Sequence, residues 1–147
     1  RVVTIRHAGK IEVIAGAFRI VVGESDVDNF SHGASGNLVA GVDVASGKMI
    51  TSIGSRSKSW PSMTDVPVHP ATGATIVGIQ LPYWPEVLAL VKKAHESIDN
   101  LHTVGWDVAI LENGPVIVEA NWRYDIDILQ VAYKKGFRKV LDEKLPS

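Results

Sequence analysis

The stretch that decides the fold is 105–121, GWDVAILENGPVIVEAN. Two apolar runs flank Asn113-Gly114, and an Asn-Gly pair between two strand-like runs is a strong signal for a β-hairpin turn. The hairpin carries three oxygen-bearing side chains, Asp107, Glu119 and Asn121. We therefore predict a β-hairpin with candidate ligands on both strands.

The length of the loop decides which of these side chains share a face, because side chains alternate between the two faces of a strand. With Asn113-Gly114 as a two-residue loop, Val108 faces Glu119, and Asp107 points away from both Glu119 and Asn121. With a three-residue loop over 112–114, and Gly114 in the left-handed conformation, the two acids lie opposite each other on one face. We predict the three-residue loop. This register pairs two apolar couples on the other face, Val108 with Val118 and Ile110 with Val116.

The three ligand candidates form a hard oxygen set, with no thiolate and no nearby histidine. Such a set suits Mg²⁺ or Mn²⁺ rather than zinc, and Mg²⁺ sites are usually completed by water and substrate phosphates. The alternative is that Asp107 and Glu119 are acids at strand ends, exposed to water. If they share a face, their repulsion raises the pKa of at least one of them unless an arginine lies close.

A second candidate site is the loop 28–37, DNFSHGASGN. Small residues such as Gly33 let backbone N–H groups approach an anion closely, and Asn29 and His32 add side-chain donors. The alternative is a surface connection rich in turn-forming residues. Arg19 has a similar ambiguity, because its guanidinium either points to solvent or lies at the metal edge, where it would suit a phosphate.

The hairpin, an Asp followed twelve residues later by Glu-x-Asn, resembles the metal-binding end of the ATP-grasp superfamily. More narrowly it resembles the sugar-transfer-associated ATP-grasp proteins, a branch related to the α-L-glutamate (RimK-like) ligases. The resemblance implies that Asp107 and Glu119 hold one Mg²⁺, and that Glu119 and Asn121 hold a second. Both ions would bridge the terminal phosphates of ATP.

The resemblance extends to the start of the chain. RimK-like ligases have an arginine that begins a strand, a turn, a longer strand with another arginine, and then an Asn and a Gly-rich loop. Arg1, Arg19 and the loop 28–37 match this order, although the family often has two glycines where this chain has Gly33-Ala34. The resemblance implies that the two arginines stabilise charge on a transferred phosphoryl group. It implies ATP, a small carboxylic acid and an amine as substrates.

Composition limits the other possibilities. The chain has 147 residues and a net charge of −1, within the size of a single domain, and it has no cysteine. No apolar run reaches the roughly eighteen residues that suggest a membrane span, and no basic stripe indicates nucleic acid binding. The lack of cysteine excludes disulfides and, with no visible signal peptide, fits a cytoplasmic location.

We predict an α+β domain with a mostly antiparallel sheet and helices packed mainly on one face, resembling the C-terminal lobe of the ATP-grasp fold. Strands are expected from the apolar and alternating runs, a long loop from the prolines of 54–75, and helices from apolar residues at helical spacing. The expected hairpins are 2–5 with 10–22, and 38–44 with 49–53. The expected helices are 85–100, 125–133 and 137–145, with a stop at Lys135-Gly136.

Because the first residue is Arg1 rather than Met, we expect residues 1–147 to be one domain of a longer protein. ATP-grasp proteins use lysines and a hinge from a preceding subdomain, so the resemblance implies a missing N-terminal lobe and an inactive fragment. Two rival functions remain open. One is a non-catalytic ATP-grasp-like binding module, and the other is a Mg²⁺-dependent phosphohydrolase.

Overall fold

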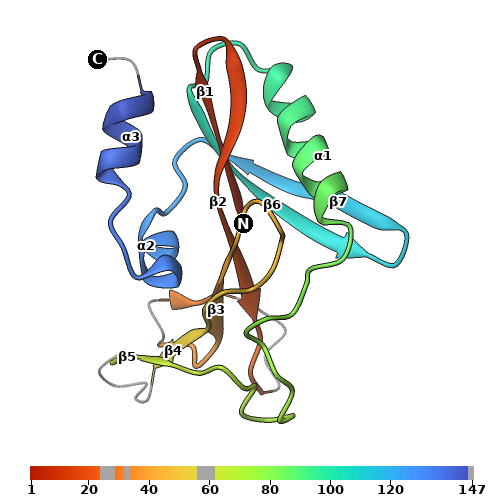
Figure 1. Cartoon of the computed structure of the whole chain (residues 1–147), viewed down its shortest axis with the longest axis vertical. Coiled ribbons are helices and arrows are strands. Elements are labelled where there is room, and N and C mark those ends of the chain that lie inside the picture. The colour runs from red at the N-terminus through yellow and green to blue at the C-terminus, as the bar shows by residue number, and fades with distance from the viewer. Residues whose placement is uncertain (24–28, 32–33, 56–61, 146–147) are drawn as a thin grey trace.

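The computed structural model describes residues 1–23, 29–31, 34–55 and 62–145. Its centre is a seven-stranded sheet in the order β5-β4-β3-β2-β1-β6-β7, and each neighbouring pair of strands is antiparallel (Figure 1). The strands are β1 Val2–His7, β2 Lys10–Ile20, β3 Leu38–Val42, β4 Ile53–Ser55, β5 Met63–Asp65, β6 Thr103–Leu111 and β7 Gly114–Asn121. The helices are α1 Trp84–Glu96, α2 Asp127–Tyr133 and α3 Arg138–Lys144.

The helices lie on both faces of the sheet. α2 and α3 cover one face, and α1 covers the other, where it contacts β1, β2, β6 and β7 (Figure 1). Successive residues of a central strand therefore enter different cores, so that Val2 packs with α1 while Val3 packs on the α2 side. The predicted α+β fold is confirmed, and two of the three described helices share one face.

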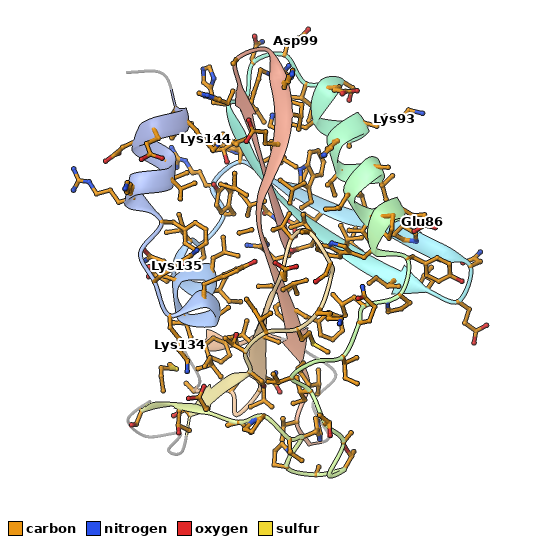
Figure 2. All side chains as sticks on the ribbon, in the orientation of Figure 1. Glu86, Lys93, Asp99, Lys134, Lys135 and Lys144 are labelled. Atoms are coloured by element: carbon orange, nitrogen blue, oxygen red, sulfur yellow. The ribbon has the colours of Figure 1, made fainter. Side chains whose placement is uncertain are left out.

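α1 contacts the sheet through an apolar stripe and turns its charges outward. Val87 and Val91 are buried, whereas Glu86 and Lys93 lie on the outer side of the helix (Figure 2). The helix ends at Glu96, earlier than predicted. Arg6 donates hydrogen bonds of 3.0 Å to the carbonyl oxygens of His95 and Ile98 at this end. The carbonyl oxygen of His95 also accepts from the backbone N–H of Ile98 at 3.1 Å, so Arg6 adds to the bonds that close the end of the helix.

The junction between 43–48 and α1 depends on a glycine. Gly47 has φ of 76°, and a Cβ there would lie 2.3 Å from Cγ of Trp84. The indole of Trp84 is buried in this gap and donates from Nε1 to the carbonyl oxygen of Val44, at 2.9 Å. The Ser46-Gly47 turn predicted from sequence therefore also makes room for the first residue of α1.

A buried polar chain joins α1 to β1 and β6. Trp106 Nε1 donates to Thr4 Oγ1 at 2.7 Å, and Thr4 Oγ1 lies 2.7 Å from Nδ1 of His95. The other ring nitrogen of His95 lies 3.0 Å from the carbonyl oxygen of Leu101. All the bonds are satisfied when neutral His95 carries its proton on Nε2 and accepts from Thr4. Burial accordingly lowers the pKa of His95.

The predicted strands are confirmed for the first hairpin and only partly for the second. Ala8 and Gly9 have φ of 48° and 74°, which suits a tight turn between β1 and β2. The run 49–53 does not form a continuous second arm, since Met49 makes an isolated bridge to Val42 and β4 begins at Ile53. The prediction of 54–75 as a loop is wrong where β4 and β5 pair across it.

The C-terminal helices match their predicted positions within about two residues, the usual uncertainty of helix ends. The stop signal lies one residue earlier than predicted, because Lys134 adopts the left-handed conformation, with φ of 54°, and caps α2. No helix in the described ranges has both the length and the apolar character needed to cross a membrane.

Candidate functional site

The hairpin of β6 and β7 places Asp107 directly opposite Glu119, as predicted. The loop length and register that produce this pairing differ from the predicted ones. Leu111 pairs with Gly114, so the loop has two residues, Glu112 and Asn113, and the predicted three-residue loop is wrong. Gly114 begins β7 with φ of 125°, a conformation that is costly for other residues.

A β-bulge on β7 compensates for the shorter loop. Asp107 pairs with Glu119 and the next residue of β6 pairs with Ile117, so Val118 is the extra residue. A bulge shifts the register of one strand by one residue, and here it returns Glu119 to the face of Asp107. The predicted apolar pairs are therefore wrong. Val108 pairs with Ile117 and Ile110 with Pro115.

Four neighbouring strands align the charged residues in one row. Val2 pairs with Trp106, and Arg1 exchanges two backbone hydrogen bonds of 2.8 Å with Ala17, so Arg1 lies between β2 and Asp107. Val2 and Trp106 pack in the core on the α1 side. Their neighbours Arg1 and Asp107 therefore face the α2 side, because side chains alternate along a strand.

Arg19 and Asn121 lie on the same face. Arg19 is two residues from Ala17, which packs in the core on the α2 side, and residues two apart on a strand share a face. Asn121 is two residues from Glu119 and pairs with Gly105. The sheet thus brings together the predicted site residues that it carries, Arg1, Arg19, Asp107, Glu119 and Asn121.

Asp107 is held by both arginines. Arg1 binds its carboxylate with two hydrogen bonds, Nε to Oδ1 at 2.6 Å and Nη2 to Oδ2 at 2.9 Å, while Arg19 Nη2 lies 3.4 Å from Oδ2. Burial acts to raise the pKa of Asp107, but the bonds to Arg1 and the charges of both arginines outweigh it, so the pKa lies below its ordinary value. The sequence analysis allowed for an arginine that offsets the repulsion between the two acids, and Arg1 and Arg19 have this effect on Asp107.

Glu119 and Asn121 have different surroundings. Glu119 is exposed, and its charge contributes to raising the pKa of Arg1, an increase due mainly to the hydrogen bond with Asp107. The side-chain Nδ2 of Asn121 is buried without a hydrogen-bond partner. Such groups are rare in native structures and call for an explanation, which includes an absent ion or water. A rotation of the amide group by 180° places the oxygen of Asn121 at this position.

The residues present fit a Mg²⁺ ion in their chemistry. Over the described ranges, no cluster of three His, Cys, Asp or Glu side chains could hold a metal ion. The candidate set instead has two carboxylates and the amide of Asn121. Asp107 keeps acceptor capacity beside Arg1, because two carboxylate oxygens offer about four lone-pair sites. Oxygens from phosphate and water would have to complete the coordination.

Two adjoining hollows flank Arg19. The metal-edge groove has a volume of about 410 Å³ and is lined by Arg19, Asn29, Asp107, Val108, Ala109, Val118 and Glu119. The Phe30 hollow, of about 260 Å³, is lined by Arg1, Arg19, Asn29, Phe30, Ser31, Asp125, Ile128 and Val131. Arg19 and Asn29 belong to both, so they stand at the boundary between the two spaces.

The segment that carries Asn29 is held by a buried amide. Asn37 is 1% exposed, accepts from the backbone N–H of Val22 at 3.0 Å, and donates to the carbonyl oxygen of Asn29 at 3.1 Å. It therefore ties the end of β2 to the lining of both hollows. The other predicted loop residues, His32 and Gly33, lie outside the described residues.

Sequence reasoning missed Asp125, and it included Asn37 only as the last residue of the loop 28–37, with no role of its own. An Asn between a Gly-rich loop and the apolar run of β3 was the only local signal for Asn37. Asp125 follows the ligand candidates by a few positions, but its place in the Phe30 hollow depends on how α2 packs against β2 and β3. No local pattern reports such packing.

His69, from the long polar stretch, lies outside this site. Its Nε2 is 2.9 Å from the carbonyl oxygen of Val21, and its Nδ1 is 3.3 Å from the backbone nitrogens of Ala71 and Thr72. These contacts close the 69–74 turn and attach it to the end of β2. They are structural.

Comparison with known proteins gives one family. Sugar-transfer associated ATP-grasp matches residues 1–144. No curated protein and no solved structure matches the chain significantly.

Proposed function

Because the chain belongs to the sugar-transfer associated ATP-grasp family, we propose that it binds the phosphates and metal of ATP in a ligase that joins a carboxylic acid to an amine. The observation that carries the proposal is the row of charges on one sheet face. Arg1, directly before β1, lies beside Asp107 of β6, which pairs with Glu119 of β7. Arg19 of β2 reaches the carboxylate of Asp107 from the other side of Arg1.

The metal would be held by Asp107, Glu119 and Asn121, with Glu119 shared when a second ion is present. When bound, it would neutralise phosphate charge and orient the phosphoryl group for transfer. The protein contributes rigidity to this arrangement. Asp107 is fixed by its hydrogen bonds to Arg1, so little side-chain freedom is lost when it takes a ligand.

The proposed reaction has two steps. A carboxylate oxygen of the acid attacks the γ-phosphorus of ATP, the bond from that phosphorus to the β–γ bridging oxygen breaks, and ADP leaves. The amine nitrogen then attacks the carbonyl carbon of the acylphosphate, phosphate leaves with the bonding electrons of the C–O bond, and the nitrogen loses a proton.

Arg1 and Arg19 would act on the charge of the transferred group. A guanidinium is planar, always protonated, and suited to phosphate oxygens. Transfer of a phosphoryl group is catalysed mainly by positioning and by charges fixed before the reaction begins. The shared position of Arg19 between the two hollows suits such a role, because the transferred group must pass from the nucleotide to the acid.

The test is product analysis on the intact protein with ATP, Mg²⁺, mixed acids and mixed amines. A ligase produces ADP over many turnovers only when an acid and an amine are both present, because the amine must consume the acylphosphate before the next turnover. Phosphate release without an acid would instead indicate the phosphohydrolase, and nucleotide binding without turnover would indicate the binding module.

The matched variants are Glu119→Gln and Glu112→Gln. Both residues are exposed acids of the same hairpin, but Glu112 lies in the loop and outside the row. We expect Glu119→Gln to abolish ADP formation and Glu112→Gln to preserve it. Equal activity of the two variants would contradict the assignment of Glu119.

A further inference from the structure

The Phe30 hollow carries charges of both signs. Arg1 and Arg19, which both contact Asp107, line it together with Asp125, from the segment that leads into α2. Phe30, Ile128 and Val131 supply apolar surface to the same hollow. At about 260 Å³ it falls below the 300–1,000 Å³ usual for drug-sized ligands, so it suits a small metabolite.

Asp125 is held in position by the backbone. Its Oδ1 accepts a hydrogen bond of 2.8 Å from the N–H of Asp127, at the start of α2. Its charge also reaches Arg1, whose pKa it helps to raise after the larger contribution of Asp107. The hollow therefore contains a positioned carboxylate that does not line the metal-edge groove, and the proposed ATP-binding role gives Asp125 no part.

Resting on the proposed ligase function, we propose that the Phe30 hollow binds the acid substrate, and that this substrate is an amino acid whose ammonium group is recognised by Asp125. The substrate carboxylate would lie toward Arg19, at the boundary with the metal-edge groove, where it must meet the γ-phosphate. Its hydrocarbon part would contact Phe30 and Ile128. Asp125 is then a specificity-determining residue, because it would touch the end of the substrate that does not react.

A recognised ammonium should change selectivity measurably. A hydrogen bond to a charged group contributes about 1.5–3 kcal/mol, which corresponds to roughly 10- to 150-fold in an equilibrium or a rate constant. Asp125 is exposed, so water takes the place of the ammonium when an acid without the amine binds, and we expect the lower end of this range.

The experiment compares straight-chain amino acids, with the ammonium at successive distances from the carboxylate, against the same acids without the amine. Hydroxylamine replaces the unknown acceptor. It attacks the acylphosphate at the carbonyl carbon, phosphate leaves, and the hydroxamate is counted together with ADP. The enzymes are the intact protein, Asp125→Asn and Asp127→Asn.

Asp125→Asn keeps the oxygen that accepts from Asp127 and removes only the charge. Asp127 is the matched control, because it is an exposed acid two residues away that does not line the hollow and accepts instead from Gln130, at 3.1 Å. We expect kcat/KM to favour at least one amino acid over its analogue by about tenfold or more. This preference should vanish in Asp125→Asn and persist in Asp127→Asn, with KM for ATP unchanged in both.

An unchanged preference in Asp125→Asn, or a preference for the acids without an amine, overturns the inference while the ligase function stands. If no acid supports ADP formation, the ligase proposal fails, and saturation-transfer NMR of the same acid pairs decides the subsite. Amino acid binding that is lost only in Asp125→Asn upholds the assignment of the Phe30 hollow as the amino acid subsite. Equal binding by all three proteins, or no binding at all, overturns it.

Discussion

Replacing Asp107 with Asn should destabilise the protein far more than replacing Glu119 with Gln, although both residues are proposed metal ligands. Asp107 and Arg1 are each only 13% exposed at the side chain, and they share two hydrogen bonds. In Asp107→Asn one carboxylate oxygen becomes an amide nitrogen, which cannot accept from Arg1 and leaves its guanidinium poorly paired. Glu119 is exposed, and the described ranges show no hydrogen bond to its carboxylate.

The size of the effect follows from the partial burial of the pair. Hydrogen bonds to charged groups contribute about 1.5–3 kcal/mol, and removing one partner of a fully buried pair costs about 3–5 kcal/mol. A pair that retains some exposure should lie lower, so we expect about 2–3 kcal/mol for Asp107→Asn. An exposed acid such as Glu119 should change the free energy of unfolding by less than about 0.5 kcal/mol.

Urea unfolding at near-neutral pH measures both variants, with the midpoint compared at constant m-value. The destabilisation caused by Asp107→Asn should also become smaller at acid pH. Because the folded pKa of Asp107 lies below its unfolded value, its stabilisation is present above the unfolded pKa of about 3.9 and is lost as pH falls through the folded pKa. An Asp107→Asn variant as stable as the Glu119→Gln variant at near-neutral pH would refute the claim that Arg1 and Asp107 form a stabilising pair.

Two further predictions concern buried polar groups. Asn37→Asp replaces the donor to the Asn29 carbonyl with a second acceptor while keeping the bond from Val22, and it should raise KM for ATP at least about tenfold in the intact protein. Thr4→Val, a buried change on the opposite face, controls for general destabilisation, and an equal rise in KM there would remove the positioning role of Asn37. For His95, the folded pKa lies below the unfolded value of about 6.5, so stability is lost as pH falls from that value, by up to about 1.4 kcal/mol per pH unit. His95→Leu should lack this part of the pH dependence in thermal unfolding scans, and identical slopes would show that His95 does not titrate between the two states.

The predicted hairpin came from local chemistry, and its errors came from features without a local signal. The Asn-Gly pair and the apolar runs were enough to place β6 and β7, but parity alone, applied to the observed loop, would have put the two acids on opposite faces. The bulge at Val118 was invisible, because Val118 is a β-branched residue among others of the same kind. The loop is one residue shorter than predicted and the bulge adds one residue to β7, so the two errors cancel. Asp107 and Glu119 therefore share a face, as predicted, although the predicted register is wrong.

The rest of the site depends on contacts between distant parts of the chain. Arg1 and Asp107 are 106 positions apart, and their pairing follows from the placement of β1 between β2 and β6. The short strands β4 and β5 have three residues each, too few for alternation to be recognised. Asp125 reaches the Phe30 hollow only through the packing of α2. The spacing of apolar residues along the sequence predicts none of these placements.

The most direct test of the central claim is a titration of the intact protein with Mn²⁺ and ATP, followed by paramagnetic broadening of backbone amide signals. Binding at the row of charges predicts that residues 105–107 and 119–121 lose intensity first. Glu112, in the loop of the same hairpin, should be affected later, and Glu119→Gln should remove the selective effect. Broadening that begins elsewhere, or that is unchanged in Glu119→Gln, would contradict the assignment of this sheet face as the metal and phosphate site.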